Sequence, residues 1–423
     1  MPLTAVRNDF ICSQADFGLI FLRLQFQEDT VNQGQTVFAQ LMQHLSHNEF
    51  HRCVDRYQGN HRIRSFTCWE QFLAMAFAQL TFRESLRDIE DSLGALPHQL
   101  YHLGFQAPVK RATLADANES RDWRIFADFA HSLIGIARPL YANSPLDIDF
   151  GEDVDAVLYA LDSTVIDLCL SLFPWAHFRR AKGAIKLHTL LEVRSHIPVF
   201  IDITRGKLHD VNALDILPLP AGSYLVVDRA YTDFKRLYLL DQSGIFFVIR
   251  AKQNLSYKRR YSHAVDKSTG ALSDQSIVLT GPKTATLYPD ALRRVHYYSA
   301  EQQQRFYFLT NNFKLTAKSV ADVYRLRWTI ETFFRWIKQN LRIKSFYGTT
   351  INSVKIQVWV SISVYLLIAI VKKRLALEQS LSQILQVLSL RQFEKTPIKS
   401  LFDDDFSQLE IVASSKQLIL LDI

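Results

Sequence analysis

Four polar residues between positions 324 and 338 follow the pattern Y-x2-R-x3-E-x6-K, with Tyr324, Arg327, Glu331 and Lys338 at its fixed positions. At about 100° per residue they fall within roughly 60° of one another on a helix, so they share one face. Apolar residues of the same segment cluster on another sector, which predicts packing against a core. A carboxylate flanked by cations suits phosphodiester chemistry, in which the carboxylate binds a divalent metal and the cations hold phosphate oxygens. A surface helix with i,i+4 ion pairs is the simpler alternative.

Two aspartates each follow a hydrophobic run that reads as a buried strand. Asp162 ends the run 156–161, ahead of a second predicted strand at 165–168, and Asp228 ends the run 224–227. A single aspartate in such a position more often caps a helix or forms a turn. Two of them together with the glutamate of the helix form a carboxylate set that can hold a pair of Mg²⁺ ions, or Mn²⁺ as a substitute.

Composition agrees with a polyanionic partner but does not require one. The chain has 49 basic and 42 acidic residues, a formal net charge of +7 and a pI near 9.1. Its four cysteines contain no C-x2-C pair, so neither structural zinc nor a disulfide framework is expected, and a reducing cytoplasm is indicated. At 423 residues the chain is too long for one compact core, so two or three domains are expected.

A strongly apolar run at 358–371 raises the question of a membrane. Its 14 residues are fewer than the roughly 20 that a transmembrane helix requires, and Lys355 and Lys372 bracket it closely. We expect a helix buried against the catalytic sheet and no membrane partner. The apolar run 17–26 is short and interrupted by Arg23, so no signal peptide is evident.

The interval between Asp228 and Glu331 is too long for one βαβ connection and predicts an insertion. It holds a predicted strand at 244–250, then a polar stretch, then another strand at 305–310. Basic residues and tyrosines alternate in the polar stretch, as in SYKRRYSH, where cations can neutralise phosphates while aromatic rings stack on unpaired bases. An ordinary solvated hairpin explains the same pattern.

Together these segments resemble the bacterial DDE transposases of insertion-sequence family four. The resemblance rests on Asp162 in LDSTVIDL, Asp228 in VVDRAY and the Y-x2-R-x3-E-x6-K signature in YRLRWTIETFFRWIKQNLRIKSF, and it covers roughly residues 31–375. The segment KGAIKLHTLLE looks like the third core strand of that family. The resemblance implies an α/β fold: a ribonuclease H-like mixed-sheet catalytic core with an inserted β-rich subdomain and an all-helical N-terminal domain.

The same resemblance implies DNA transposition, with metal-dependent cleavage and strand transfer at the ends of an insertion sequence. Asp162, Asp228 and Glu331 would be the catalytic metal ligands. The partners would be DNA, as terminal inverted repeats and target, and a second copy of the chain, in the bacterial cytoplasm at the nucleoid. A catalytically inactive DNA-binding relic or repressor and a stand-alone nuclease remain alternatives. The residues expected to contact DNA are Tyr324, Arg327, Lys338, Arg229, Lys182, Lys186, His188, Arg259 and Arg260.

The domain organisation follows from these assignments. Family-like sequence begins at Val31, so the residues before it are expected to be an extension with little fold of their own. The helical N-terminal region is expected to bind DNA, although a scaffold or dimerisation domain fits its pattern almost as well. The predicted segments are an unstructured extension (1–30), the helical N-terminal domain (31–145), the first part of the core (150–250), the β-rich insertion (251–312), the second part of the core with the signature (313–375) and a C-terminal helical tail (376–423).

Overall fold

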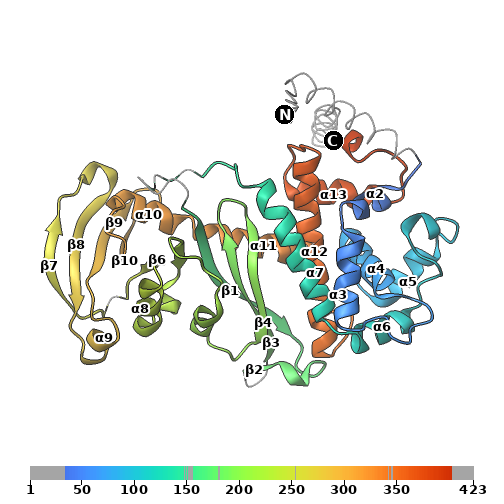
Figure 1. The fold of residues 1–423 in the computed structure, drawn as a ribbon, viewed down its shortest axis with the longest axis horizontal. Coiled ribbons are helices and arrows are strands. Elements are labelled where there is room, and N and C mark those ends of the chain that lie inside the picture. The colour runs from blue at the N-terminus through green and yellow to red at the C-terminus, as the bar shows by residue number, and fades with distance from the viewer. Residues whose placement is uncertain are drawn as a thin grey trace, which may run out of the picture.

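The structure is a computed structural model that describes residues 34–402 apart from 147, 149, 151–155, 180–181, 253, 342 and 344–345. A broad sheet forms one half of the elongated molecule and helices gather in the other half (Figure 1). Helices α7 and α12 lie between the sheet and the remaining N-terminal helices. The extension predicted over residues 1–30 lies outside the described residues.

The first N-terminal helices begin where a serine or threonine caps them. The side chains of Thr36, Ser46, Thr67 and Ser85 each accept a hydrogen bond from an amide of the first turn. At Thr67 the carboxylate of Glu70 bonds back to the cap amide and completes a capping box. The elements are α2 (Val37–Gln43), α3 (His47–Arg56), α4 (Cys68–Leu80), α5 (Leu86–Gly94), the 3₁₀ turn η1 (Tyr101–Leu103), α6 (Arg111–Ser120) and α7 (Arg124–Leu140).

Helix α12 (Ile351–Arg374) contains the apolar run and is long and apolar enough to cross a membrane, yet 94% of its apolar window is buried inside the protein. A helix that is hydrophobic all round belongs in a core when protein covers it on every side. The predicted burial is thus confirmed, but the expected partner differs. The helix packs mainly on α7 and α4 rather than on the sheet. Its Tyr365 hydroxyl donates to the His196 carbonyl, 2.8 Å away, in the turn between β3 and β4.

The described strands form one ten-stranded sheet, and its central part surrounds β1. Strand β3 pairs with β1 and β4 in antiparallel fashion, whereas β1, β5 and β6 run parallel. The segment KGAIKLHTLLE is a strand over its full length, as predicted. The elements are β1 (Leu158–Leu168), η2 (Pro174–Ala176), β2 (His177–Arg179), β3 (Lys182–Glu192), β4 (Ile197–Arg205), η3 (Asp210–Ile216), β5 (Tyr224–Val227), η4 (Arg229–Tyr231), α8 (Phe234–Gln242) and β6 (Phe246–Arg250).

Strand β1 differs from the prediction in one respect: it is continuous through Asp162 instead of ending there. Asp162 lies opposite Thr189 and Ser163 opposite His188, so the polar residues stay within the ladder and the two predicted strands are one. Polar residues interrupt the hydrophobic pattern but not the backbone hydrogen bonds, which is why the sequence suggested an end.

Alternate residues of β1 face opposite sides of the sheet. Leu158 and Ala160 join the large core that includes α12, whereas Leu161 joins the second core with residues of α8. Burial of each such leucine contributes about 1.5–3 kcal/mol, which makes the strand register costly to change. The alternation turns Asp162 toward the junction before α11 and Ser163 toward η3.

The inserted strands extend the core sheet, because β10 pairs with β6 in antiparallel fashion. Their turns are specified locally. Gly270 has φ +91°, and a Cβ there would lie 2.6 Å from the Tyr298 carbonyl oxygen. Between β8 and β9 a buried ion pair joins Arg293 Nη2 to Asp274 Oδ2 at 2.6 Å. The elements are β7 (Tyr257–His263), η5 (Lys267–Thr269), β8 (Ala271–Leu279), α9 (Pro282–Leu287), β9 (Leu292–Ser299) and β10 (Gln304–Thr310).

The signature occupies two helices instead of the single predicted one. α10 (Ala317–Arg325) ends after Tyr324, and α11 (Trp328–Asn340) begins after Arg327. At the junction the Arg327 amide bonds to the Tyr324 carbonyl and the Ile330 amide to the Arg327 carbonyl, which are i→i+3 bonds of a tightened 3₁₀-type turn. The chain continues through α12 to α13 (Leu381–Arg391) and η6 (Lys399–Leu401).

Candidate active site

Arg327 lies between two of the predicted carboxylates. Its Nη2 is 2.7 Å from Glu331 Oε1, and its Nη1 is 3.5 Å from Asp162 Oδ2. The arginine side chain is only 14% exposed, and its Nε has no hydrogen-bond partner among the described residues. Ion pairs from one guanidinium therefore join the α10–α11 junction to strand β1.

Tyr324 connects the same junction to the third carboxylate. Its hydroxyl donates to Asp228 Oδ1 at 3.3 Å, and its ring packs on Phe308 with centroids 4.7 Å apart. The Arg327 guanidinium carbon lies 5.8 Å from the centre of the same ring. Burial raises the pKa of Tyr324 to about 12, so the hydroxyl stays protonated and remains a donor at neutral pH.

The Asp162 carboxylate lies in a strongly perturbed electrostatic environment. Burial raises the pKa of Asp162 to about 6; the Ser163 amide and Arg327 lower it, whereas the charges of Glu331 and Asp228 raise it. The negative charges of Glu331 and Asp228 thus act on Asp162, and one cation, Arg327, bridges Asp162 and Glu331.

A divalent metal fits this donor set by chemistry, although the described residues hold no ready cage. No group of three or more histidine, cysteine, aspartate or glutamate side chains in the described part of the chain lies close enough to hold an ion. The Arg327 guanidinium contacts both Asp162 and Glu331 and so competes for their oxygens. Carboxylate oxygens are nonetheless the ligands that Mg²⁺ and Mn²⁺ prefer, and buried acids that repel one another favour a bound cation.

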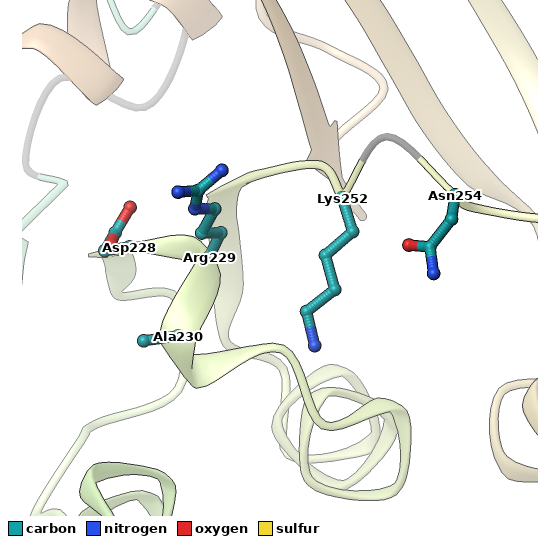
Figure 2. Close-up of a pocket in the computed structure, with 5 residues that line it drawn as sticks. All are labelled: Asp228, Arg229, Ala230, Lys252 and Asn254. Atoms are coloured by element: carbon teal, nitrogen blue, oxygen red, sulfur yellow. The ribbon is translucent and has the colours of Figure 1, made fainter.

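Two further predicted cations lie near this centre. Lys338 Nζ donates to the Val165 carbonyl at 2.9 Å, which places it against β1. Arg229 is exposed beside Asp228 and lines a cavity of about 630 Å³ together with Lys252. Figure 2 shows Arg229 between Asp228 and Lys252, with Asn254 on the far side. A cationic hollow therefore adjoins the end of β5.

The remaining predicted DNA contacts are not gathered at the carboxylates. Lys186 Nζ is bonded to the Leu208 carbonyl, and His188 is 1% exposed, both on the sheet face opposite Arg327. Because its side chain is buried, His188 does not lie on a surface that DNA can contact in this structure. Arg259 and Arg260 are exposed on β7, the strand at the far edge of the sheet. The side chain of Lys182 lies outside the described residues.

The structure also gathers polar residues that the sequence did not single out. Asp210 Oδ1 accepts hydrogen bonds from Ser163 Oγ at 2.6 Å and from Lys186 Nζ at 3.0 Å. Tyr231, which follows Asp228 in η4, is buried nearby. Ser163 and Tyr231 lie close to the predicted aspartates in sequence, and that proximity is a signal that could have found them. Asp210 follows no recognisable pattern, because its partners come from two other strands.

Comparison with known proteins identifies the class. The family described as "Transposase DDE domain" matches residues 154–367, and a domain of unknown function, DUF4372, matches residues 33–106. The transposase-named protein y4zB of Sinorhizobium fredii is 30% identical over 261 residues, which cover 61% of this chain and 70% of y4zB. A transposase-named protein for insertion sequence IS5377 of Geobacillus stearothermophilus is 31% identical over 216 residues, covering 50% of this chain and 55% of the relative. One named for IS4SA of Synechocystis is 22% identical over 268 residues, covering 61% of this chain and 70% of the relative.

The match to the DDE domain spans the strands and helices that carry the three predicted acids. The match to the DDE domain begins just before β1 and ends within α12. The predicted function and enzyme class are therefore confirmed: the chain belongs to the transposase DDE domain family and is a DNA transposase of a bacterial insertion sequence.

Proposed function

We propose that Asp162, Asp228 and Glu331 are the acids of the DDE centre and that they hold the divalent metal on which strand cleavage depends, Mg²⁺ or Mn²⁺ in its place. The observation that carries this proposal is the pair of contacts from the signature: Arg327 bridges Asp162 and Glu331, and Tyr324 bonds to Asp228. Residues far apart in sequence are thus joined by the members of one spacing pattern.

The residues around the acids have distinct proposed tasks. Bound divalent ions would supply an activated hydroxyl nucleophile and stabilise the leaving oxygen of an in-line displacement. Tyr324 orients the Asp228 carboxylate through its hydroxyl. Lys338 and Arg229 present cations on either side of the centre, where phosphates of the DNA end would bind.

Arg327 has two proposed partners at different stages. Without metal and DNA its guanidinium is the counter-ion of Asp162 and Glu331. When a divalent cation neutralises those acids, the guanidinium is free to turn to a phosphate of the scissile end, with which it can form paired charge-assisted hydrogen bonds. Metal loading and phosphate binding would then be coupled through one side chain.

The finer family and fold are proposals as well. We place the chain in insertion-sequence family four, since its residues match the Y-x2-R-x3-E-x6-K signature and one relative is named for IS4SA. A ribonuclease H-like core is supported by the order β4-β3-β1-β5-β6, with β3 antiparallel to both of its neighbours. The proposed segments keep the boundaries given above, although the insertion shares its sheet with the core.

The biological setting follows from the class. The proposed DNA partners are the terminal inverted repeats of the element and its target, held by two copies of the chain so that both ends are cut together. The helical N-terminal domain is the proposed reader of the repeats, and the nucleoid is the proposed place of action. Contacts from Arg259 and Arg260 would be made far from the cut, at the outer edge of the insertion.

The test is cleavage of the DNA that flanks the gene of this protein. Glu331→Gln removes a proposed ligand with little change in volume, so the purified variant should bind the ends but leave supercoiled donor DNA uncut in Mg²⁺. Asp322→Asn is the matched control, because Asp322 lies on α10 and pairs with Lys318 and Arg325 rather than with the centre. Wild-type cutting by the glutamine variant would refute the ligand role. End binding without cutting by the wild-type protein would favour the inactive relic.

A further inference from the structure

A polar cluster around Asp210 lies behind Asp162, on the opposite face of the sheet. Asp210 opens η3, and its Oδ1 accepts hydrogen bonds from Ser163 Oγ at 2.6 Å and Lys186 Nζ at 3.0 Å. His188 Nδ1 is 3.7 Å from the same oxygen, and its Nε2 lies 2.9 Å from Thr204 Oγ1. Side chains from two strands, β1 and β3, thus meet at the Asp210 carboxylate, and Thr204 of β4 contacts His188 behind them.

Ser163 connects this cluster to the active-site acid. Its hydroxyl donates to Asp210 on one face of the sheet, and its amide donates to Asp162 Oδ1 at 2.8 Å. Successive side chains of a strand point to opposite faces, so a hydrogen bond that fixes Ser163 also fixes the backbone that carries Asp162. An aspartate side chain has two rotatable bonds, and the hydrogen bond from the Ser163 amide restrains both of them in Asp162.

The cluster also reaches the loop that carries the second acid. Tyr231 is buried in η4, which begins directly after Asp228 and packs against η3. Burial, and then the charges of Asp162 and Asp210, raise the pKa of Tyr231, so this hydroxyl lies within the field of both carboxylates. Because η3 packs against η4, the element that carries Asp210 also supports the end of β5.

If Asp210 served only to hold its loop in place, its bond to Lys186 would suffice, because the Lys186 ammonium also bonds to the Leu208 carbonyl just before η3. The Ser163 contact is not required to hold that loop. We propose that Asp210 is a positioning residue of the transposase: through Ser163 it fixes the orientation in which Asp162 presents its carboxylate to the divalent metal, an inference that rests on the ligand role proposed above for Asp162.

The test compares the full chain with Ser163→Ala, Ser163→Thr, Asp210→Asn and the double variant Ser163→Ala/Asp210→Asn. Mn²⁺ binding to the DNA-free protein is followed by the electron paramagnetic resonance of the free ion, and cleavage of the flanking DNA is followed against Mn²⁺ concentration. Loss of a partner that orients a metal ligand typically weakens affinity or activity by 10–100-fold, so each alanine or asparagine variant should need roughly 10-fold more Mn²⁺. Because both act through one link, the double variant should be no weaker than the worse single variant. Ser163→Thr keeps the hydroxyl and suits a strand, so it should restore Mn²⁺ binding.

Asp215→Asn is the matched control, since Asp215 lies in the same η3 helix but pairs with Arg236 at 2.7 Å. It should leave the Mn²⁺ requirement unchanged. Wild-type Mn²⁺ binding in Ser163→Ala, equal weakening in Asp215→Asn, or multiplied effects in the double variant would each overturn the positioning role. Should Asp210→Asn fail to fold, the Ser163→Ala and Ser163→Thr pair still decides the outcome. If the wild-type protein itself neither binds Mn²⁺ nor cuts, the ligand role of Asp162 fails first and the positioning role with it.

Discussion

Replacement of Asp162 by asparagine should stabilise the metal-free protein at neutral pH. The Asp162 side chain is 23% exposed, and its burial raises the pKa from 3.8 to about 6. A rise of roughly 2 pKa units corresponds to about 3 kcal/mol of unfavourable ionisation in the folded state. The asparagine side chain carries no charge and has nearly the same volume, so the variant would avoid this cost.

The pH dependence has a definite sign. Since the folded-state pKa of Asp162 lies above the unfolded value, the folded protein binds an extra proton between about pH 4 and pH 6, and wild-type stability falls as pH rises through that window. The advantage of Asp162→Asn should therefore be about 3 kcal/mol at pH 7.5 and well under 1 kcal/mol at pH 4.

Thermal and denaturant unfolding in EDTA at both pH values measure the difference. Asp167→Asn is the control, because Asp167 is exposed on the same strand, and it should change stability by less than about 0.5 kcal/mol. Addition of Mg²⁺ should raise the wild-type unfolding temperature more than that of Asp162→Asn. A variant that is no more stable than wild type at pH 7.5, or equally stabilised at both pH values, would refute the reasoning.

Three further outcomes are expected. Arg327→Ala should weaken the complex with the element end and lower the slope of log affinity against log salt by about 1, as measured by filter binding at several salt concentrations; an unchanged slope would leave Arg327 a structural ion pair. Arg293→Ala should cost about 3–5 kcal/mol, because it leaves the buried Asp274 carboxylate unpaired, and limited proteolysis should then cut within the insertion before it cuts elsewhere. Cys169 is exposed and a hydrogen bond from Ser171 lowers the pKa of its thiol, whereas burial raises the pKa of Cys53 to about 11. Iodoacetamide should therefore modify Cys169 faster than Cys53, as followed by mass spectrometry, and equal rates at these two residues would contradict this.

Local patterns in the sequence predicted much of the fold. The hydrophobic runs at 224–227 and 244–250 predicted two strands, and the structure has β5 and β6 there. The break between α10 and α11 left no such trace, because neither glycine nor proline marks it. It arises from i→i+3 bonds around Arg327, and Arg327 itself turns to carboxylates that the local pattern does not contain.

The residues of the candidate site also fall into two groups: those that the sequence indicated and those that it did not. The contacts of Arg327 and Tyr324 with the predicted acids could be expected from the sequence, because each residue has a fixed place relative to a strand or helix; the ligand role of the acids stays a prediction. Their neighbours were harder to anticipate. Lys186 and His188 read as cations on a core strand, yet the alternation of that strand turns them away from Arg327 and toward Asp210. The helix that packs on a strand decides which face of the strand carries the candidate site. That helix is distant in sequence, so the local pattern does not reveal the contact.

The shared sheet has a mechanical consequence for the insertion. Its strands are hydrogen-bonded in series from β7 through β10 to β6, and β6 lies beside β5, whose end carries Asp228. If a bound DNA duplex twisted the outer edge of the sheet, the hydrogen-bonded strands would transmit that twist toward β6. The insertion is therefore coupled through β6 to the neighbouring strand β5, at whose end the proposed catalytic acid Asp228 lies.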